Sequence, residues 1–308
     1  MNLLDYRLLA VTGKGGVGTT SVAAAVAVCA AKTGRKVLLC EVEPGGGAAA
    51  ATGAKRIRYE PSATATVRLK VMSMDTERSV RDFVKIMTRV PMPVAAGPLA
   101  RILDFVATAA PGVREILTVG KLAHEVRLAT YDLVVMDGPP TGHIVGHLAA
   151  TEGVAEIAGG GLLGRQAAWM RDILHDPTKT AALICATPEE LPVSEALDLR
   201  QRIDTETGVA VAGFVLNSVR PPSLRPNIEA AVADLVLHES KRLDGTRSAL
   251  RSAVLAGQLR RAGADAASRL RTDAQTLPVW ALPLVTSGGD DAALVNELAD
   301  ALGAELDL

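Results

Sequence analysis

The stretch LLAVTGKGGVGTTSV, residues 8–22, decides the fold class of this chain. Its first part, Leu8 to Thr12, has the apolar pattern of a β-strand, and a helical pattern begins near Ser21 after a glycine-rich turn. A strand, a glycine loop and a helix in this order are the layout of a P-loop, in which backbone N–H groups surround phosphate oxygens at a helix N-terminus. The stretch therefore predicts a phosphate-binding loop. The alternative is a plain turn between a strand and a helix.

The loop follows the P-loop frame G-x-x-x-x-G-K-[ST] except at the position of its lysine. Gly13, Gly18 and Thr20 fall on the frame, whereas Thr19 stands where the frame has lysine. That lysine contacts the β- and γ-phosphates, and each such charge-assisted hydrogen bond is worth about 1.5–3 kcal/mol. The backbone and the Thr20 hydroxyl, a Mg²⁺ ligand in this frame, remain, so we expect phosphate binding to survive and hydrolysis to weaken. The predicted phosphate-binding residues are Gly13, Lys14, Gly15, Gly16, Val17, Gly18, Thr19, Thr20 and Ser21.

Composition restricts the class of protein. With 308 residues, of which 48% are hydrophobic and 22% charged, the chain fits a globular protein and is neither disordered nor collagen-like. Its 33 basic residues nearly balance its 34 acidic ones, which argues against a nucleic-acid partner. The N-terminus lacks a signal-peptide pattern and no window reads as a membrane span, so we expect a cytoplasmic protein. The three cysteines form no CxxC motif, so we expect them in the core and expect no zinc.

Short apolar runs alternate with longer helical patterns along the chain, which is typical of a parallel sheet covered by helices on both faces. We therefore predict an α/β fold with a doubly wound, mostly parallel sheet of about seven to eight strands. Ligands of such sheets bind at the carboxyl ends of the strands. The site should accordingly form near Gly13, Glu43, Asp137, Ala186 and Asn217. The predicted strands cover residues 8–12, 36–42, 67–72, 131–137, 179–186, 209–217 and 279–284.

Three stretches depart from this alternation. Residues 76–127 and 151–178 contain helical segments broken by prolines or glycines, and we interpret them as helical insertions. Residues 226–276 are rich in Ala, Leu and Arg and predict a helical hairpin before the last strand. Since no internal repeat or long linker is found, we expect residues 1–308 to form one elaborated domain rather than two.

The position of Lys14 gives the loop a likeness to a known family. The run KGGVGTT, Lys14 to Thr20, resembles the K-G-G-x-G-[K]-T pattern of the deviant Walker A branch of P-loop nucleotidases. In that branch the early lysine reaches across a nucleotide-sandwich dimer to the partner's phosphates. The resemblance therefore implies a dimer in which Lys14 acts in trans. The alternative is a solvated loop lysine.

A second segment resembles the switch I loop of the same branch. VLLCEVEPGGG, residues 37–47, is similar to V-L-L-x-x-x-D-P-A, and Glu43, just before Pro44, stands where an aspartate positions or deprotonates the attacking water. Glutamate is one methylene longer, which changes the distance from a general base to the water. The alternative for Glu43 is an exposed loop carboxylate.

The most specific match is YDLVVMDGPPTGHIVGHL, residues 131–148. It resembles the switch II motif F-D-x-x-V-x-D-T-A-P-T-G-H-T-x-R-x-L of the ArsA/Get-type family, the arsenical-pump and tail-anchored-protein targeting ATPases. The resemblance implies that Asp137 holds Mg²⁺ through water, together with Thr20. Lys14, Glu43 and Asp137 are the catalytic candidates. The other switch residues that it implies are Pro44, Gly138, Pro140, Thr141, Gly142 and His143.

Two weaker segments agree with this family. FVLNS, residues 214–218, resembles its strand ending I-V-N-Q, whose asparagine recognises adenine, so Asn217 is the implied adenine ligand. A turn-capping asparagine is the alternative. The closing segment resembles P-L-L-P-x-E-x-x-G-x-x-x-L, which implies that Pro283 and Leu284 flank the base.

The resemblance implies an adenine-nucleotide-binding ATPase that uses ATP or ADP with Mg²⁺. Because Thr19 replaces the lysine, we expect a dimer subunit with weak or partner-dependent hydrolysis, paired with itself or with a paralogous ATPase. Its nucleotide state would be coupled to a partner or client. The alternatives are a nucleotide-binding scaffold that does not hydrolyse ATP and a membrane-protein targeting factor.

Overall fold

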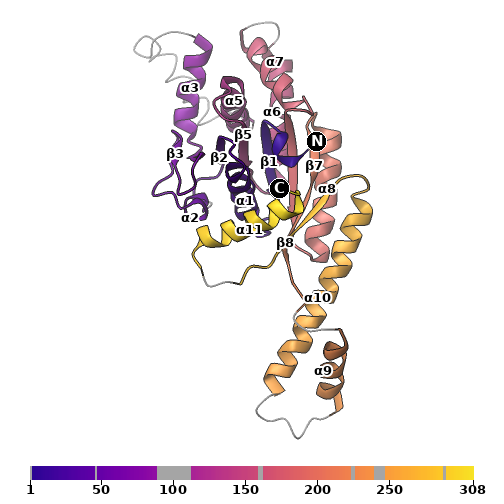
Figure 1. Cartoon of the computed structure of the whole chain (residues 1–308). Helices are drawn as coiled ribbons and strands as arrows, with labels where there is room; N and C mark the ends of the chain where they lie inside the picture. Colours follow the sequence, from indigo (N-terminus) through magenta and orange to yellow (C-terminus); the bar gives the residue numbers. More distant parts are fainter. Residues whose placement is uncertain are drawn as a thin grey trace.

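An eight-stranded sheet runs through the computed structural model, which describes residues 2–45, 47–88, 112–158, 162–222, 226–238, 247–286 and 289–308 (Figure 1). The strand order is β3-β4-β2-β5-β1-β6-β7-β8, and all neighbours are parallel except β3 and β4. The strands are β1 (Leu8–Gly13), β2 (Val37–Glu41), β3 (Ser62–Ala63), β4 (Leu69–Ser73), β5 (Leu133–Asp137), β6 (Thr180–Ala186), β7 (Ala210–Val219) and β8 (Val279–Pro283).

The fold class predicted from the sequence is confirmed. Every predicted run forms a strand, with its ends displaced by at most two residues. The strand that the sequence did not predict is β3, where Ser62 and Ala63 pair antiparallel with β4. A segment of this length shows neither an apolar run nor an alternation, so its sequence carries no strand signal.

Strand β1 lies at the topological switch point of the sheet, between β5 and β6. All its residues are buried, as the central strand of a sheet covered on both faces requires. The chain passes from β1 to β2 on one side, whereas β6 lies on the other, so a crevice opens at the carboxyl end of β1. Parallel register places Asp137 beside both Val11 and Glu41. Side chains from these three strands therefore meet at one edge of the sheet.

Helices form a layer on each face of the sheet (Figure 1). One layer holds α1, α2 and α11, and the other includes α5, α6, α8 and α10. The helices are α1 (Thr19–Lys32), α2 (Ala48–Thr52), α3 (Thr76–Thr88), α5 (Val113–Leu128), α6 (Thr141–Ala158), α7 (Leu162–Leu174), α8 (Glu190–Glu206), α9 (Pro226–His238), α10 (Arg247–Asp273) and α11 (Asp291–Glu305), with a short 3₁₀ turn at Leu3–Asp5.

Helix α1 is buried because its sequence is apolar on every side. Residues Val22 to Ala31 are all buried, and the helix packs between the sheet and α11. A helix that is hydrophobic all round belongs in a core. Its N-terminus is thereby fixed directly after the glycine loop.

Helices occupy the described parts of the three predicted insertions. Residues 76–127 contain α3 and most of α5, while residues 89–111 lie outside the described residues. Residues 151–178 contain the end of α6 and all of α7, and α9 and α10 form a hairpin that extends from the body of the molecule (Figure 1). None of the helices in the described ranges is both long and apolar enough to cross a membrane.

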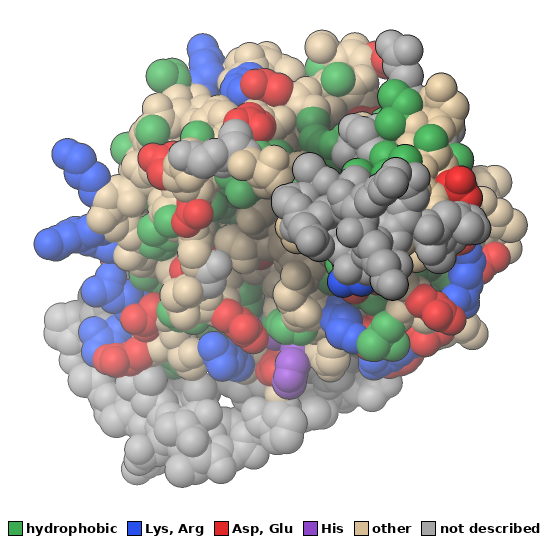
Figure 2. All heavy atoms as spheres, turned by 90° about the horizontal axis from the view of Figure 1, so that it is seen from below, with side chains coloured by type: hydrophobic (Ala, Val, Ile, Leu, Met, Phe, Trp, Pro, Cys, Tyr) green, Lys and Arg blue, Asp and Glu red, His purple; other side chains and the backbone are tan. Residues whose placement is uncertain are grey.

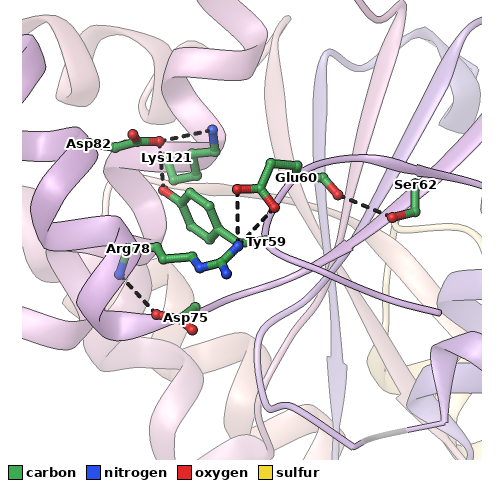
Figure 3. A network of polar contacts seen from close by, with 7 residues as sticks. All are labelled: Tyr59, Glu60, Ser62, Asp75, Arg78, Asp82 and Lys121. Carbon is green, nitrogen blue, oxygen red and sulfur yellow. Dashed lines mark hydrogen bonds and ion pairs between the residues drawn. The ribbon is translucent and has the colours of Figure 1, made fainter.

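A polar network fastens the segment after α2 to α3 and α5 (Figure 3). The hydroxyl of Tyr59 donates to Asp82 at 3.0 Å, and the ammonium of Lys121 lies 3.6 Å from the same carboxylate and 5.0 Å from the Tyr59 ring centre. Lys121 also pairs with Glu125 at 3.0 Å, and Arg78 binds both oxygens of Glu60. The segment after α2 is therefore bound directly to α3 and α5.

Candidate functional site

A pocket of about 330 Å³ lies at the carboxyl edge of the sheet. Three segments that are distant in sequence contribute to it: the glycine loop after β1, the loop after β2 and the end of β5. This is the edge at which the sequence predicted a site. The lining residues are Gly13, Lys14, Gly15, Gly16, Gly18, Thr19, Thr20, Glu43, Asp137, Gly138 and Pro140.

The glycine loop requires glycine where its backbone turns or lies against a neighbour. Gly18, which begins α1, has a φ of 86°, a left-handed conformation that side chains disfavour. A Cβ on Gly13 would lie 2.5 Å from the carbonyl oxygen of Cys185. The first turn of α1 has no side-chain cap, and an uncapped helix N-terminus attracts anions through its N–H groups and its dipole.

Asn217 is hydrogen-bonded to the backbone of this loop. Its side-chain amide is buried and donates to the carbonyl oxygen of Val17 at 2.9 Å. The same amide nitrogen would lie 2.5 Å from a Cβ on Gly18. Asn217 therefore couples the end of β7 to the loop, and its side chain does not line the pocket. Its predicted role as the adenine ligand remains a prediction.

Pro283 and Leu284, the predicted flanks of the base, lie elsewhere on the same edge. Pro283 is the exposed last residue of β8, and the N–H of Leu284 donates to Val219 at 2.8 Å. Leu284 lines a second cleft, of about 320 Å³, between the ends of β6, β7 and β8 and α10. The two clefts share no lining residue.

Asp137 is the buried carboxylate of the pocket. Its pKa is raised to about 7, chiefly by burial and to a smaller extent by the carboxylates of Glu41 and Glu43, while a hydrogen bond from the Thr20 hydroxyl lowers it. A hydroxyl and a carboxylate in contact are a donor pair that suits Mg²⁺, which takes oxygen ligands and keeps several waters. Among the described residues, no three His, Cys, Asp or Glu side chains converge to hold a metal ion alone. Thr20 and Asp137 therefore fit a Mg²⁺ ion that is shared with phosphate and water.

Glu41 is a site residue that the sequence reasoning missed. It is 4% exposed, and its two carboxylate oxygens accept from the N–H groups of Gly45 and Ala48, each at 3.3 Å. It thus fixes the turn that carries Glu43 and the start of α2. The signal available was a charge at the end of an otherwise apolar strand run, VLLCE.

The switch II residues begin inside the pocket and continue onto α6. The N–H of Gly138 donates to Val11 and the hydroxyl of Thr12 donates to Pro139, each at 2.8 Å, so this loop is tied to β1. Thr141, Gly142 and His143 form the first turn of α6 outside the pocket lining. The remaining predicted residues do not line the pocket: Val17, within the loop, packs into the hydrophobic core, and Ser21 and Pro44 are also absent from the lining.

Lys14 forms an intramolecular ion pair that the sequence did not predict. Its ammonium lies 2.8 Å from Oε1 of Glu195 on α8, and both side chains are about one-third exposed. Lys14 is the one cation among the described residues that line the pocket. The pocket thus combines the backbone of the glycine loop, the carboxylates of Glu43 and Asp137 and a lysine that is already paired.

The comparisons with known proteins agree with this geometry. A family model described as "Anion-transporting ATPase", the ArsA ATPase model, matches residues 6–158, which include the glycine loop and both switch segments. The chain is 30% identical over 325 aligned positions to ATPase BagA of Mycobacterium tuberculosis, covering 98% of this chain and 94% of that protein.

Two more distant relatives match shorter regions. A protein of Halobacterium salinarum named as an arsenical pump-driving ATPase is 26% identical over 242 positions, covering 69% of this chain and 36% of that protein. ATPase GET3 of Ajellomyces dermatitidis is 29% identical over 146 positions, covering 46% of this chain and 43% of that protein. One relative matches nearly the whole chain, and the ArsA ATPase model matches the part that holds the glycine loop and both switch segments. This chain therefore belongs to the ArsA family of anion-transporting ATPases.

Proposed function

We propose that this chain binds ATP or ADP with Mg²⁺ in the glycine-loop pocket and works as one subunit of a two-subunit, cytoplasmic ATPase. One observation carries the proposal: the loop, Glu43, Asp137 and Thr20 line the same pocket at the switch point of the sheet. The name of the matched family and the printed names of the relatives support ATP as the nucleotide.

The roles of the residues follow from their positions. Backbone N–H groups of the loop would bind the phosphates, and Thr20 with Asp137 would hold Mg²⁺. Mg²⁺, when bound, supplies positive charge to the β- and γ-phosphates. Glu43 lines the same pocket as the loop, and its carboxylate would orient the attacking water.

We propose that hydrolysis depends on a partner subunit because the pocket is poor in positive charge. Thr19 supplies none, and Lys14 is paired with Glu195. A second copy or a paralogous ATPase would contribute the missing cation across the interface. Basic and acidic side chains are interspersed on the face seen in Figure 2, so nucleic acid is not a partner in this proposal.

Helices α3 and α5 would change position with the nucleotide state. Switch I leads into α2, and the segment after α2 is bound to α3 and α5 through Tyr59, Asp82 and Lys121. A movement of Glu43 toward a γ-phosphate would therefore be transmitted to those helices.

Calorimetry on matched glycine variants tests nucleotide binding. Gly18→Ala places a side chain at a positive φ against Asn217, whereas Gly34→Ala, a control with φ 92°, has open space around it. Both variants carry backbone strain, but only Gly18→Ala should weaken Mg²⁺-ADP binding. An absence of wild-type binding at millimolar nucleotide would contradict the proposal, as would equal affinities of the two variants.

Steady-state kinetics separate an ATPase subunit from a scaffold that does not hydrolyse ATP. We expect slow ATP turnover by the isolated chain and faster turnover after addition of a paralogous subunit with a complete P-loop, above the rate of that subunit alone. If the mixture turns over ATP no faster than the paralogous subunit alone, while this chain still binds nucleotide, the scaffold is favoured. The absence of the P-loop lysine at Thr19 is consistent with that alternative.

A client-binding role is a second candidate, favoured by exposed apolar side chains. Ile228 and Leu235 on α9 and Leu255 and Leu259 on α10 are 40–55% exposed. A membrane-protein segment would cover such side chains. Fluorescence anisotropy with an apolar helical peptide of about 20 residues tests this role, and Leu255→Glu should weaken the binding. Equal binding by both proteins would count against the hairpin as the client surface.

A further inference from the structure

Lys14 and Glu195 form an ion pair that joins the phosphate loop to α8. The two residues are 181 positions apart in sequence. They meet because the loop follows β1, α8 follows β6, and these two strands are parallel neighbours in the sheet. Its separation of 2.8 Å is that of a charge-assisted hydrogen bond. Lys14, which lines the pocket, thus has a defined intramolecular partner on α8.

The charges around the pocket make this pair consequential. Glu43 and Asp137 line the pocket, and Glu41 lies next to Asp137 in the sheet. Glu195 offsets the positive charge of Lys14, which lines the pocket. A polyphosphate that enters the pocket therefore meets acidic side chains and a lysine that it must share with another carboxylate.

We infer that Glu195 is a positioning residue that holds Lys14 in the partner-free chain and competes with polyphosphate for its ammonium. The inference rests on the proposed function, because it assumes that the pocket receives phosphates. When a phosphate or a partner subunit takes Lys14, the pair opens and α8 loses its contact with the loop. Glu195 accordingly keeps the affinity of the lone subunit low.

A double-mutant cycle between Lys14 and Glu195 tests the inference. The probe is sodium tripolyphosphate, titrated without Mg²⁺ into the wild type, Glu195→Gln, Lys14→Met and the double variant by calorimetry at low salt. Partly exposed ion pairs are worth little, so Glu195→Gln should tighten binding roughly two- to fivefold. The same substitution in the Lys14→Met background should change nothing, because the ammonium for which Glu195 competes is gone.

A control on the same helix separates this role from a general loss of charge. Glu206 pairs with Arg202 on the exposed side of α8, so Glu206→Gln breaks an ion pair without touching the loop. It should leave tripolyphosphate affinity unchanged. Melting curves establish that each variant is folded. We expect the Lys14 and Glu195 variants to fold because both side chains are about one-third exposed.

The outcomes distinguish this inference from the proposed function. If the wild type binds tripolyphosphate and Glu195→Gln binds it no more tightly, or tightens equally in the Lys14→Met background, the inference is wrong and the nucleotide site stands. If neither the wild type nor Glu195→Gln binds tripolyphosphate or Mg²⁺-ADP, both are wrong.

Discussion

Asp137 shows how the fold controls charge at the scale of a single residue. Its carboxylate is 6% exposed at the end of β5 and adjoins Glu41 in the neighbouring strand. Burial and nearby acids raise its pKa to about 7 from an ordinary value of 3.8. A folded-state pKa above the unfolded value means that the folded protein binds the proton more tightly. The contribution to stability is therefore present at acid pH and is lost as the pH rises through about 7.

Asp137→Asn should remove this pH dependence. Without nucleotide and Mg²⁺, we expect the variant to be more stable than the wild type above pH 7, by up to roughly 4 kcal/mol. The difference should shrink as the pH falls from about 7 to about 4 and vanish near about 3, where the aspartate is mostly neutral in both states. Urea unfolding at several pH values measures it. Parallel stability profiles of the two proteins would show that Asp137 is not held protonated by its surroundings.

Asp137→Asn should also weaken the Mg²⁺ dependence of nucleotide binding, because an amide is a poorer ligand for Mg²⁺ than a carboxylate. Calorimetric titrations of ADP with and without Mg²⁺ give the ratio of affinities. We expect a smaller ratio in the variant. A ratio equal to that of the wild type would return Asp137 to a purely structural role.

Thr19 is the residue at which the loop departs from its frame. Thr19→Lys restores a cation beside the phosphates, so nucleotide affinity should rise by about 1.5–3 kcal/mol, roughly ten- to a hundredfold. Affinity is read by calorimetry and turnover by phosphate release. If Lys14 already serves the phosphates, the added lysine changes little and Lys14→Ala abolishes the activity. A harmless Lys14→Ala together with an ineffective Thr19→Lys would contradict both expectations.

At the scale of elements, the network around Lys121 joins α3, α5 and the segment after α2. Lys121 is 13% exposed and pairs with Glu125, which is 9% exposed, and with Asp82. Lys121→Met leaves Glu125 buried without its cation, which should lower the free energy of unfolding by about 1–3 kcal/mol. The exposed pair of Arg81 and Glu77 is the control, and Arg81→Met should cost less than about 1 kcal/mol. Equal losses in urea unfolding would show that the network adds no specific stability.

Contacts within a short stretch of sequence were predictable, and contacts between distant elements were not. The glycine loop follows its strand directly and Asp137 ends an apolar run, so local pattern placed both at the carboxyl edge. Glu195 reaches Lys14 only because β1 and β6 are neighbours in the sheet, and no local pattern gives that order. Asn217 was predicted at this edge for the same reason as Asp137, but its contact with Val17 depends on three-dimensional packing.

At the scale of the whole molecule, the proposed contribution of a cation by a partner subunit can be tested through the oligomeric state of the chain. If two subunits share the nucleotide, Mg²⁺-ATP should increase the sedimentation coefficient of the chain, alone or mixed with a paralogous ATPase. The increase should be weaker in Lys14→Ala, because that lysine would reach the partner's phosphates. A monomer at every nucleotide and protein concentration, with and without the paralogue, would exclude the two-subunit arrangement.

A crystal structure of the full chain with Mg²⁺ and ADP tests the central claim most directly. The claim predicts the diphosphate within the loop Gly13–Thr20 and Mg²⁺ beside Thr20 and Asp137. An ADP molecule in the second cleft beside Leu284 and α10, or crystals grown in millimolar ADP with no nucleotide at the loop, would contradict it.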